Sequence, residues 1–327
     1  MTTPTQNILL RYQYILVLFA VAVAEFAIVF LHRGHEVPWF AYWWMFPIAF
    51  TIALTVNTAG ISGAALFVPF FILIFPFLSG IHLPAIDTVK LGLITESFGL
   101  SSSALAFFAF GLVDVRLARG SILAAIPFII LGAFAVSLVP GSILYLMVAV
   151  LLIIAALLLQ FENILKRKTG EGGAPRAQDE PPVERTSIDG TTYRYAYTKG
   201  GSVRRFLGYA VGGGFQGATG FGIGEMGIIS MMLSRIPVRI AIGTSHLVVA
   251  AGAIIAVIIH FAIASHAAGA GSQFAWNIPV MTIPAVFLGG QLAPYVAAKL
   301  PIRFLERFIS VLFIIIATAL VVVALRA

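Results

Sequence analysis

The chain has 327 residues, of which 60% are hydrophobic and 10% are charged, and its mean hydropathy is +1.01. Apolar runs recur almost from end to end, a pattern typical of a helical membrane protein and not of a soluble domain. The chain has no cysteine, which excludes disulfides, iron–sulfur clusters and thiolate zinc sites. Nine of the twenty lysines and arginines fall between Lys166 and Arg205, so the net charge of +7 indicates membrane topology and not nucleic-acid binding.

The N-terminal region, residues 1–42, is predicted to be an anchor helix followed by an outer loop. Its apolar run covers about residues 14–31. Arg11 and the segment Ala22-Val23-Ala24 also fit a secretory signal peptide with a cleavage site. The apolar run continues past that site, which favours an uncleaved helix.

The first transmembrane half is predicted over residues 43–160 and opens with an apolar run that is too long for one membrane span. Its middle reads Asn57-Thr58-Ala59-Gly60-Ile61-Ser62-Gly63, and Pro69 and Pro76 follow. Small residues and prolines of this kind favour two half-length helices around a break. Three spanning helices are expected after it, at about 88–110, 119–139 and 142–160.

Residues 161–203 form a polar linker that is expected to lie in the cytoplasm. The segment Ser187-Ile188-Asp189-Gly190-Thr191 and the residues that follow it predict a small β-hairpin with an Asp-Gly turn. The second transmembrane half, residues 204–327, again opens with a Gly-rich broken segment, 206–234. Nine of the residues from 208 to 227 are glycine, a density that interrupts a helix. Spanning helices are expected near 239–264, 277–297 and 304–325.

The two halves resemble each other in sequence. Gly60-Ile61-Ser62 aligns with Gly222-Ile223-Gly224, and the pattern Ile126-Pro127 with Leu131-Gly132 recurs at the same spacing as Ile283-Pro284 with Leu288-Gly289. Lysine and arginine are enriched in cytoplasmic loops, and with the linker inside every short basic loop obeys this rule if segment 206–234 enters and leaves on one face. The fold class predicted is therefore an all-α polytopic membrane protein with an extra N-terminal helix and two inverted repeats. Each repeat is a broken, re-entrant helix hairpin plus three transmembrane helices, although a continuous kinked helix at either segment is an open alternative.

These motifs resemble the sulfite exporter TauE/SafE family of bacterial membrane proteins. The resemblance lies in the two Gly-rich segments that open the two halves, in the Pro237-to-Ser245 pattern, in the Gly111-x-x-Asp114 loop and in the Ile-Pro-x-x-x-Leu-Gly helix of each half. The chain departs from the family in its extra N-terminal helix and its long linker. The resemblance implies a secondary transporter of small sulfur-containing anions such as sulfite or organosulfonates, in the bacterial inner membrane.

Candidate substrate-binding residues lie at the two helix breaks, because exposed backbone N–H groups at interrupted helix ends bind anions without bringing in full charges. The first break supplies Gly60, Ser62 and Gly63, with Asn57 and Thr58 as hydrogen-bonding side chains, and the second supplies Gly220, Gly222 and Gly224, with Gln216 and Thr219. The alternative is close helix packing alone, as the GxxxG pairs Gly213/Gly217 and Gly220/Gly224 favour.

Ionisable residues within the apolar segments are functional candidates, because a charge there is costly. Glu225 adjoins the second break and is the leading proton-coupling candidate, with Glu96 and His246 as possible partners across the two halves; a structural, hydrogen-bonded role is the alternative. Lys90 is a candidate cation for the substrate, or else reaches toward the outer surface. Glu25 is expected to make an interhelical contact or to lie at the interface, and both His260 and His266 are expected at the outer interface.

Function classes other than transport find little support. The segment Gly222 to Gly227 matches G-x-G-x-x-G, but no predicted strand precedes it, which argues against a nucleotide site. The scattered histidines predict no metal site, and no cofactor is expected. The prediction is a carrier with alternating access and a small anionic substrate, and with protons as the coupling ion. A carboxylate or other inorganic-anion carrier, an ion channel and an intramembrane enzyme remain alternatives, and the oligomeric state is open.

Overall fold

The computed structural model describes residues 4–32, 37–169, 182–267, 274–297, 299 and 302–326. The helices of the first part of the chain are α1 (Pro4–Leu31), α2 (Met45–Ala59), α3 (Ala64–Pro69), the π-helix η1 (Phe70–Ile74), α4 (Phe75–Ser79), α5 (Ala85–Ala109), α6 (Val115–Ser137) and α7 (Gly141–Thr169). The strands β1 (Val183–Thr186) and β2 (Thr192–Tyr195) follow. The remaining helices are α8 (Lys199–Thr219), α9 (Ile223–Leu233), α10 (Val238–Ala267), α11 (Asn277–Ala297) and α12 (Ile302–Arg326).

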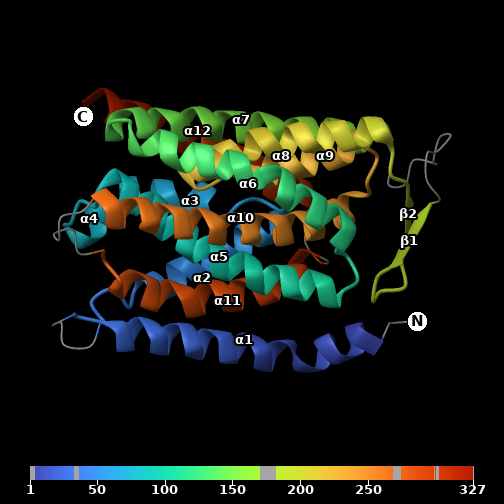
Figure 1. Ribbon diagram of the computed structural model, residues 1–327, viewed down its shortest axis with the longest axis horizontal. Coiled ribbons are helices and arrows are strands. Elements are labelled where there is room, and N and C mark those ends of the chain that lie inside the picture. Colours follow the sequence, from blue (N-terminus) through green and yellow to red (C-terminus); the bar gives the residue numbers. More distant parts are fainter. Residues whose placement is uncertain are drawn as a thin grey trace.

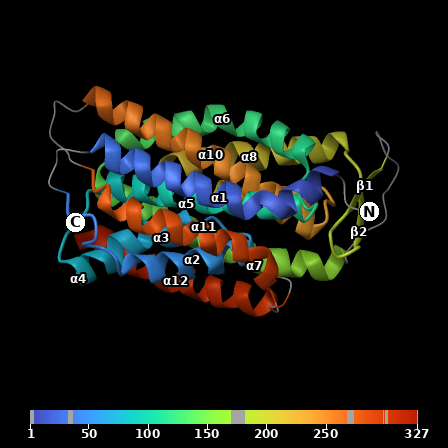
Figure 2. The ribbon, with the colours of Figure 1, turned by 90° about the horizontal axis from the view of Figure 1, so that it is seen from below.

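Among the described residues, seven helices are long and apolar enough to cross a membrane. They lie in α1, α5, α6, α7, α10, α11 and α12, where the apolar runs predicted spanning helices. The prediction of a polytopic helical membrane protein is confirmed. Helix α1 lies at the edge of the bundle against α5 and α11 (Figures 1 and 2). Only 6% of its most apolar window is buried inside the protein.

The two Gly-rich segments are broken helices, because a residue in the left-handed conformation ends the first helix of each. Gly60 (φ 78°) ends α2 and donates its N–H to Val56 O, and Gly220 (φ 91°) ends α8 and donates to Gln216 O. Glycine adopts this conformation without the steric cost that a Cβ brings. The sequence comparison of the two halves aligned Gly222 with Gly60. In the structure, however, Gly220 is the residue that ends its helix in the way that Gly60 does. Gly222 (φ 119°) instead comes directly before α9.

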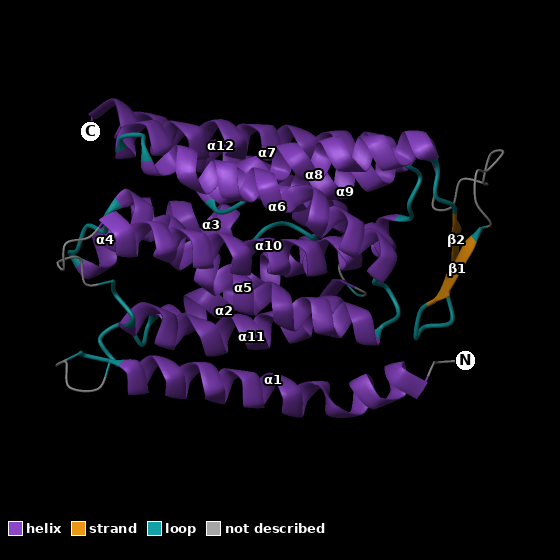
Figure 3. Cartoon of the chain, in the orientation of Figure 1, coloured by secondary structure: helices purple, strands orange, loops and turns teal. Residues whose placement is uncertain are grey.

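The broken segments lie at opposite parts of the bundle (Figure 1). Helices α2, α3 and α4 occupy the part away from the β-hairpin, and α8 and α9 occupy the part beside it. Short loops are visible inside the bundle in Figure 3, away from its two ends. We call the end that carries β1 and β2 the linker end.

Helices that occupy the same place in the order of the two predicted halves pack in a reciprocal way: α6 against α8, and α11 against α2. The glycines of the repeated Leu-Gly motif make both contacts close. A Cβ added at Gly132 of α6 would lie 2.0 Å from Gly214 O of α8, and one added at Gly289 of α11 would lie 2.9 Å from Leu54 N of α2. Helices α5 and α10 pack together between these pairs, and α7 packs on α12.

The predicted β-hairpin is confirmed, with β1 and β2 antiparallel and Ser187 N donating to Thr191 O across the turn (2.9 Å). Its docking site is Asp114, which caps α6 by accepting hydrogen bonds from Arg116 N and Leu117 N (3.0 and 3.1 Å). Asp114 Oδ2 also accepts the hydroxyls of Tyr195 and, at 2.6 Å, Tyr197. The carboxylate thus links the linker to the bundle.

Burial by itself raises the pKa of Asp114, but the hydrogen bonds from the two tyrosines and from Leu117, together with Arg185, outweigh it and hold that pKa below its ordinary value. Burial and the hydrogen bond to Asp114 raise the pKa of both tyrosines. At neutral pH the Asp114 carboxylate is therefore ionised and accepts hydrogen bonds, and both tyrosine hydroxyls are protonated and donate them.

Candidate functional site

The tips of the two broken segments meet at Ser62. Its backbone N–H donates to Glu225 Oε1 (3.1 Å), in the first turn of α9, and its hydroxyl donates to Glu96 Oε1 on α5. Ala64 N, which follows the first break, lies 3.5 Å from the same Glu96 oxygen. One serine therefore joins both breaks to the two candidate carboxylates.

Both carboxylates are buried and only half satisfied. Glu96 is 2% exposed and Glu225 is 6% exposed, and the Oε2 atom of each has no hydrogen-bond partner among the described residues. Neither makes an ion pair within that part of the chain. Two acids in contact with one serine form a polar centre that can hold a proton or donate hydrogen bonds to an anion when protonated.

Three more candidate side chains are buried with an oxygen that lacks a hydrogen-bond partner in the described structure. These oxygens are Asn57 Oδ1 and Thr58 Oγ1 in the last turn of α2, and Gln216 Oε1 near the end of α8. Gln216 is held by a hydrogen bond from Nε2 to Val249 O (3.2 Å). Buried polar atoms usually have partners, so these unsatisfied atoms make both breaks candidates for contact with a polar ligand.

The glycines named as candidates divide into two groups. Gly224 lies at the meeting point, since a Cβ added there would be 3.7 Å from Ser62 N, and Gly63 is the N-cap residue of α3 directly after Ser62. Gly60, Gly220 and Gly222 set the backbone of the breaks through their positive φ angles.

Close packing explains the neighbouring glycines on α8. A Cβ added at Gly213 would lie 2.9 Å from Ala125 O, and one added at Gly217 would lie 2.1 Å from Ile129 O, both on α6. Thr219 was a candidate ligand, but its hydroxyl bonds Phe215 O of its own helix (2.9 Å). Packing and a polar site therefore occur together, on different residues of one segment.

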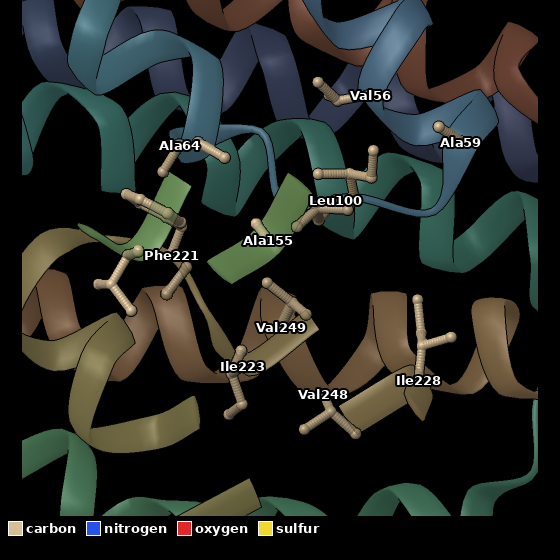
Figure 4. Close-up of a cluster of buried hydrophobic side chains, with 14 of the residues drawn as sticks. Val56, Ala59, Ala64, Leu100, Ala155, Phe221, Ile223, Ile228, Val248 and Val249 are labelled. Carbon is tan, nitrogen blue, oxygen red and sulfur yellow. The ribbon is translucent and has the colours of Figure 1, made fainter. Parts of the chain in front are cut away.

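An apolar shell surrounds the breaks. Figure 4 shows Phe221 and Ile223 of the second break region, Ala64 after the first break, Leu100 of α5 and Ala155 of α7, all buried. A cavity of about 10 Å³ adjoins this shell and is lined by Gly60, Ile61, Glu225, Ile228 and Leu159, among others. That volume holds about one water molecule, so an anion enters only if the tips separate.

A second cavity, of about 100 Å³, lies between the first break and the linker end. Thr58 and Phe107 line it within the bundle, and Asp189 and Arg239 line it at the hairpin. These two charged residues form an ion pair of 3.1 Å between the linker and α10. The cavity thus extends from an unsatisfied hydroxyl at the break to an exposed ion pair.

His246 lies beside the site but does not face Glu96. Its Nδ1 hydrogen bonds with Ser103 Oγ (2.8 Å), and its ring meets that of Phe107 edge-on at 4.8 Å. Ser103 is seven residues beyond Glu96 on α5, on the order of 10 Å along the helix axis. The hypothesis that His246 faces Glu96 is wrong, although His246 Nε2 is buried without a partner among the described residues.

Two basic residues also differ from expectation. Lys90 is buried and ion-paired with Asp87 (2.9 Å), so it neither reaches the surface nor offers a free charge at the breaks. His260 was expected at the interface but is buried, and its Nε2 hydrogen bonds with Gly217 O (2.8 Å). The side chain of His266 lies outside the described residues. Glu25 has one buried oxygen, Oε1, without a partner in the described structure.

Sequence reasoning missed two contacts that shape the site. Ser245 Oγ donates to Gly224 O (3.4 Å), and Thr244 Oγ1 accepts the N–H of Asp114 (2.9 Å). Both residues belong to the Pro237-to-Ser245 pattern, which was the available signal.

Comparison with known proteins gives a family but no individual relative. The model of the family described as "Sulfite exporter TauE/SafE" matches residues 45–320. Neither the curated proteins nor the solved structures include a match. The family match covers both broken segments and all helices from α2 to α11, with most of α12. The chain is thus a multi-pass membrane protein that belongs to the sulfite exporter TauE/SafE family.

Proposed function

We propose that this protein is a secondary transporter that exports small sulfur-containing anions, such as sulfite or an organosulfonate, through a site between the two helix breaks. The observation that carries the proposal is the 3.1 Å hydrogen bond from Ser62 N–H to Glu225 Oε1, which joins the two breaks. Backbone N–H groups at interrupted helices are suited to bind oxyanions inside a membrane. The family supports the substrate class.

Glu225 holds the donor that the substrate needs. An anion oxygen that takes the Ser62 N–H has to displace Glu225 Oε1, and an ionised carboxylate would repel it. A proton on Glu225 removes this repulsion and adds a hydrogen-bond donor. Substrate and proton therefore occupy the site together, so that each anion exported down its own outward gradient carries a proton out with it. Ser62 Oγ and Ala64 N, which both contact Glu96, supply further donors.

Access alternates between the two ends of the bundle in this proposal. The 10 Å³ cavity beside Glu225 is closed to an anion, whereas the 100 Å³ cavity between Thr58 and the linker end resembles part of an inner pathway. Separation of the Asp189–Arg239 ion pair would open that pathway to the cytoplasm. The reciprocal packing of α6 on α8 and α11 on α2 supports two inverted repeats that move against each other.

The first experiment measures anion flux in proteoliposomes, with and without a pH gradient, for wild type and Glu225→Gln. The glutamine keeps the shape and the acceptor oxygen but cannot exchange a proton. We expect the pH-driven net flux to fall by about 100-fold, while substrate exchange without a gradient keeps a measurable rate. Glu25→Gln is the matched control, since it makes the same change on α1. If the net anion flux of Glu225→Gln depends on the pH gradient as in wild type, Glu225 is not the proton-coupling group.

Topology is tested separately with single cysteines, because the natural chain has none. If both broken segments are re-entrant, cysteines at Trp43 and His82 react only with an impermeant reagent outside the cell. Cysteines at Glu184 and Pro237 react only from the cytoplasm. Labelling of position 237 from outside, with 184 still inside, contradicts the second re-entrant hairpin.

Substrate class is tested by counter-flow over sulfite, sulfate, thiosulfate, sulfonates and carboxylates. Trans-stimulation by sulfur oxyanions supports the proposal, and a preference for carboxylates favours the alternative carrier. Flux without trans-stimulation indicates a channel. A carrier is accelerated by substrate on the opposite side because its binding site returns loaded, whereas a permanently open path has no site that must return.

A further inference from the structure

A cavity of about 270 Å³ lies away from the helix breaks, at the linker end of the bundle. Its walls are the N-terminal parts of α6 and α8, up to Ala124 and Phe206, and a tyrosine of the linker. The polar lining residues are Arg116, Ser121, Tyr197, Ser202 and Arg205. The proposed transport path does not use this cavity. Its lining includes two guanidinium groups but no carboxylate.

Arg205 is the central group of this cavity. It is 8% exposed, and its Nη2 donates to Ser202 Oγ (3.0 Å), while its Nη1 is buried and has no acceptor among the described residues. Arginine keeps its charge at any ordinary pH, and a buried guanidinium is normally paired. A buried cation with an unused donor therefore points to an anionic ligand.

Asp114, whose charge acts on Arg205, does not fill that role. Asp114 accepts the hydroxyls of Tyr195 and Tyr197 and the N–H groups at the start of α6, and it lies 3.6 Å from Arg185 Nη2. Across the cavity the guanidinium of Arg116 lies over the Tyr197 ring at 4.7 Å, which holds a second positive charge at the wall.

We propose that this cavity binds a phosphate group, either on an anionic lipid headgroup or as free phosphate, with Arg205 Nη1 as its main donor. The planar guanidinium matches phosphate oxygens and can donate two parallel hydrogen bonds to them. The volume suits a headgroup and not a larger ligand. Val203 and Phe206 are 59% and 50% exposed next to the cavity, so acyl chains attached to the phosphate have an apolar surface to lie against.

The test measures the melting temperature of the purified full chain against rising concentrations of three probes. These are dioctanoyl phosphatidate, inorganic phosphate and dioctanoylglycerol, which carries the same chains without phosphate. Stabilisation by phosphatidate alone assigns the site to a lipid headgroup, and stabilisation by both phosphates assigns it to the phosphate group itself. A chain stabilised by neither, or equally by dioctanoylglycerol, overturns the proposal.

Variants locate the binding. Arg205→Gln should weaken phosphate binding by about tenfold or more, because it removes a charged donor. Arg204→Gln removes the same charge from an exposed neighbour and should leave binding within about twofold. Gly120→Leu places a side chain in the cavity at a position where an added Cβ meets no atom within 4 Å, so it should abolish phosphate binding without a steric clash. It is the test variant if Arg205→Gln does not fold. Equal losses in the two arginine variants, or unchanged binding in Gly120→Leu, contradict the proposal.

Discussion

The contact between α6 and α8 gives a stability prediction at Gly217. A Cβ placed there would lie 2.1 Å from Ile129 O and 2.9 Å from Ala133 N, and real Cβ atoms are essentially never found closer than 3.0 Å to such atoms. Both neighbours are backbone atoms of α6, so no side-chain rotation relieves the overlap. Gly217→Ala therefore forces α6 away by about 1 Å in a close-packed interior.

The cost follows from two opposing terms. Overpacking costs about 3 kcal/mol at the upper end of its usual range, while replacing a helical glycine by alanine returns about 1 kcal/mol. The expected net loss for Gly217→Ala is about 2 kcal/mol. Gly214→Ala is the control on the same helix, because its Cβ would meet its nearest atom, Phe128 O, at 3.9 Å. It should gain up to about 1 kcal/mol.

Equilibrium unfolding in mixed micelles, followed by tryptophan fluorescence, measures both variants. The predicted difference between them is about 3 kcal/mol, the sum of a loss at position 217 and a gain at 214. If Gly217→Ala is as stable as Gly214→Ala, the α6–α8 contact yields to a methyl group, and the assignment of Gly217 to close packing is refuted.

Two further predictions concern the linker and the helix tip. Asp114→Asn should speed amide exchange in residues 183–197 by about tenfold or more, since an amide has one acceptor oxygen and cannot serve both the tyrosine hydroxyls and the N–H groups of α6 as the two carboxylate oxygens do. In wild type the pKa of Asp114 lies below its ordinary value of 3.8, so docking stability is fully present above that value and is lost only as pH falls through the lowered pKa. Protection, corrected for intrinsic rates, should thus stay constant from pH 8 to pH 5, and a loss within that range contradicts the account. Ser62→Ala should lower the rate of substrate exchange by about tenfold, because it removes the hydroxyl at the helix tip. Thr219→Val is the control, since the Thr219 hydroxyl bonds its own helix, and its exchange rate should stay within about twofold of wild type. Equal effects of the two changes would show that the Ser62 hydroxyl has no special role.

The helices were predictable because membrane spans are defined by length and hydropathy, both of which are local properties. The breaks at Gly60 and Gly220 were predictable for a similar reason, since glycine density marks them. Which glycine ends each helix was not, because several neighbouring glycines can adopt positive φ and only packing selects one. The ion pair of Lys90 with Asp87 had a local signal, a spacing of three residues on one helix, that sequence reasoning did not use.

Contacts between distant parts of the chain had no such signal. The hydrogen bond from Tyr195 to Asp114 spans 81 residues, and nothing local relates the two. His260 was expected at the interface because it lies near the end of its helix. Whether a side chain near a helix end faces lipid or protein depends on the neighbouring helices. Here α8 packs over His260 and offers Gly217 O as its hydrogen-bond partner.

The asymmetry of the site follows from how each break is held. Glu96 of α5 accepts the Ser62 hydroxyl at the first break, and Ser245 of α10 donates to Gly224 O near the second. Helices α5 and α10 thus support the two breaks, and among the described contacts an acid does so at the first break and a serine at the second. Glu225 comes from the other half and reaches the same serine. In the proposed mechanism, movement between the halves would therefore separate Glu225 from Ser62 while Glu96 stays with its own break, so the proposal gives the coupling role to Glu225 and a positioning role to Glu96.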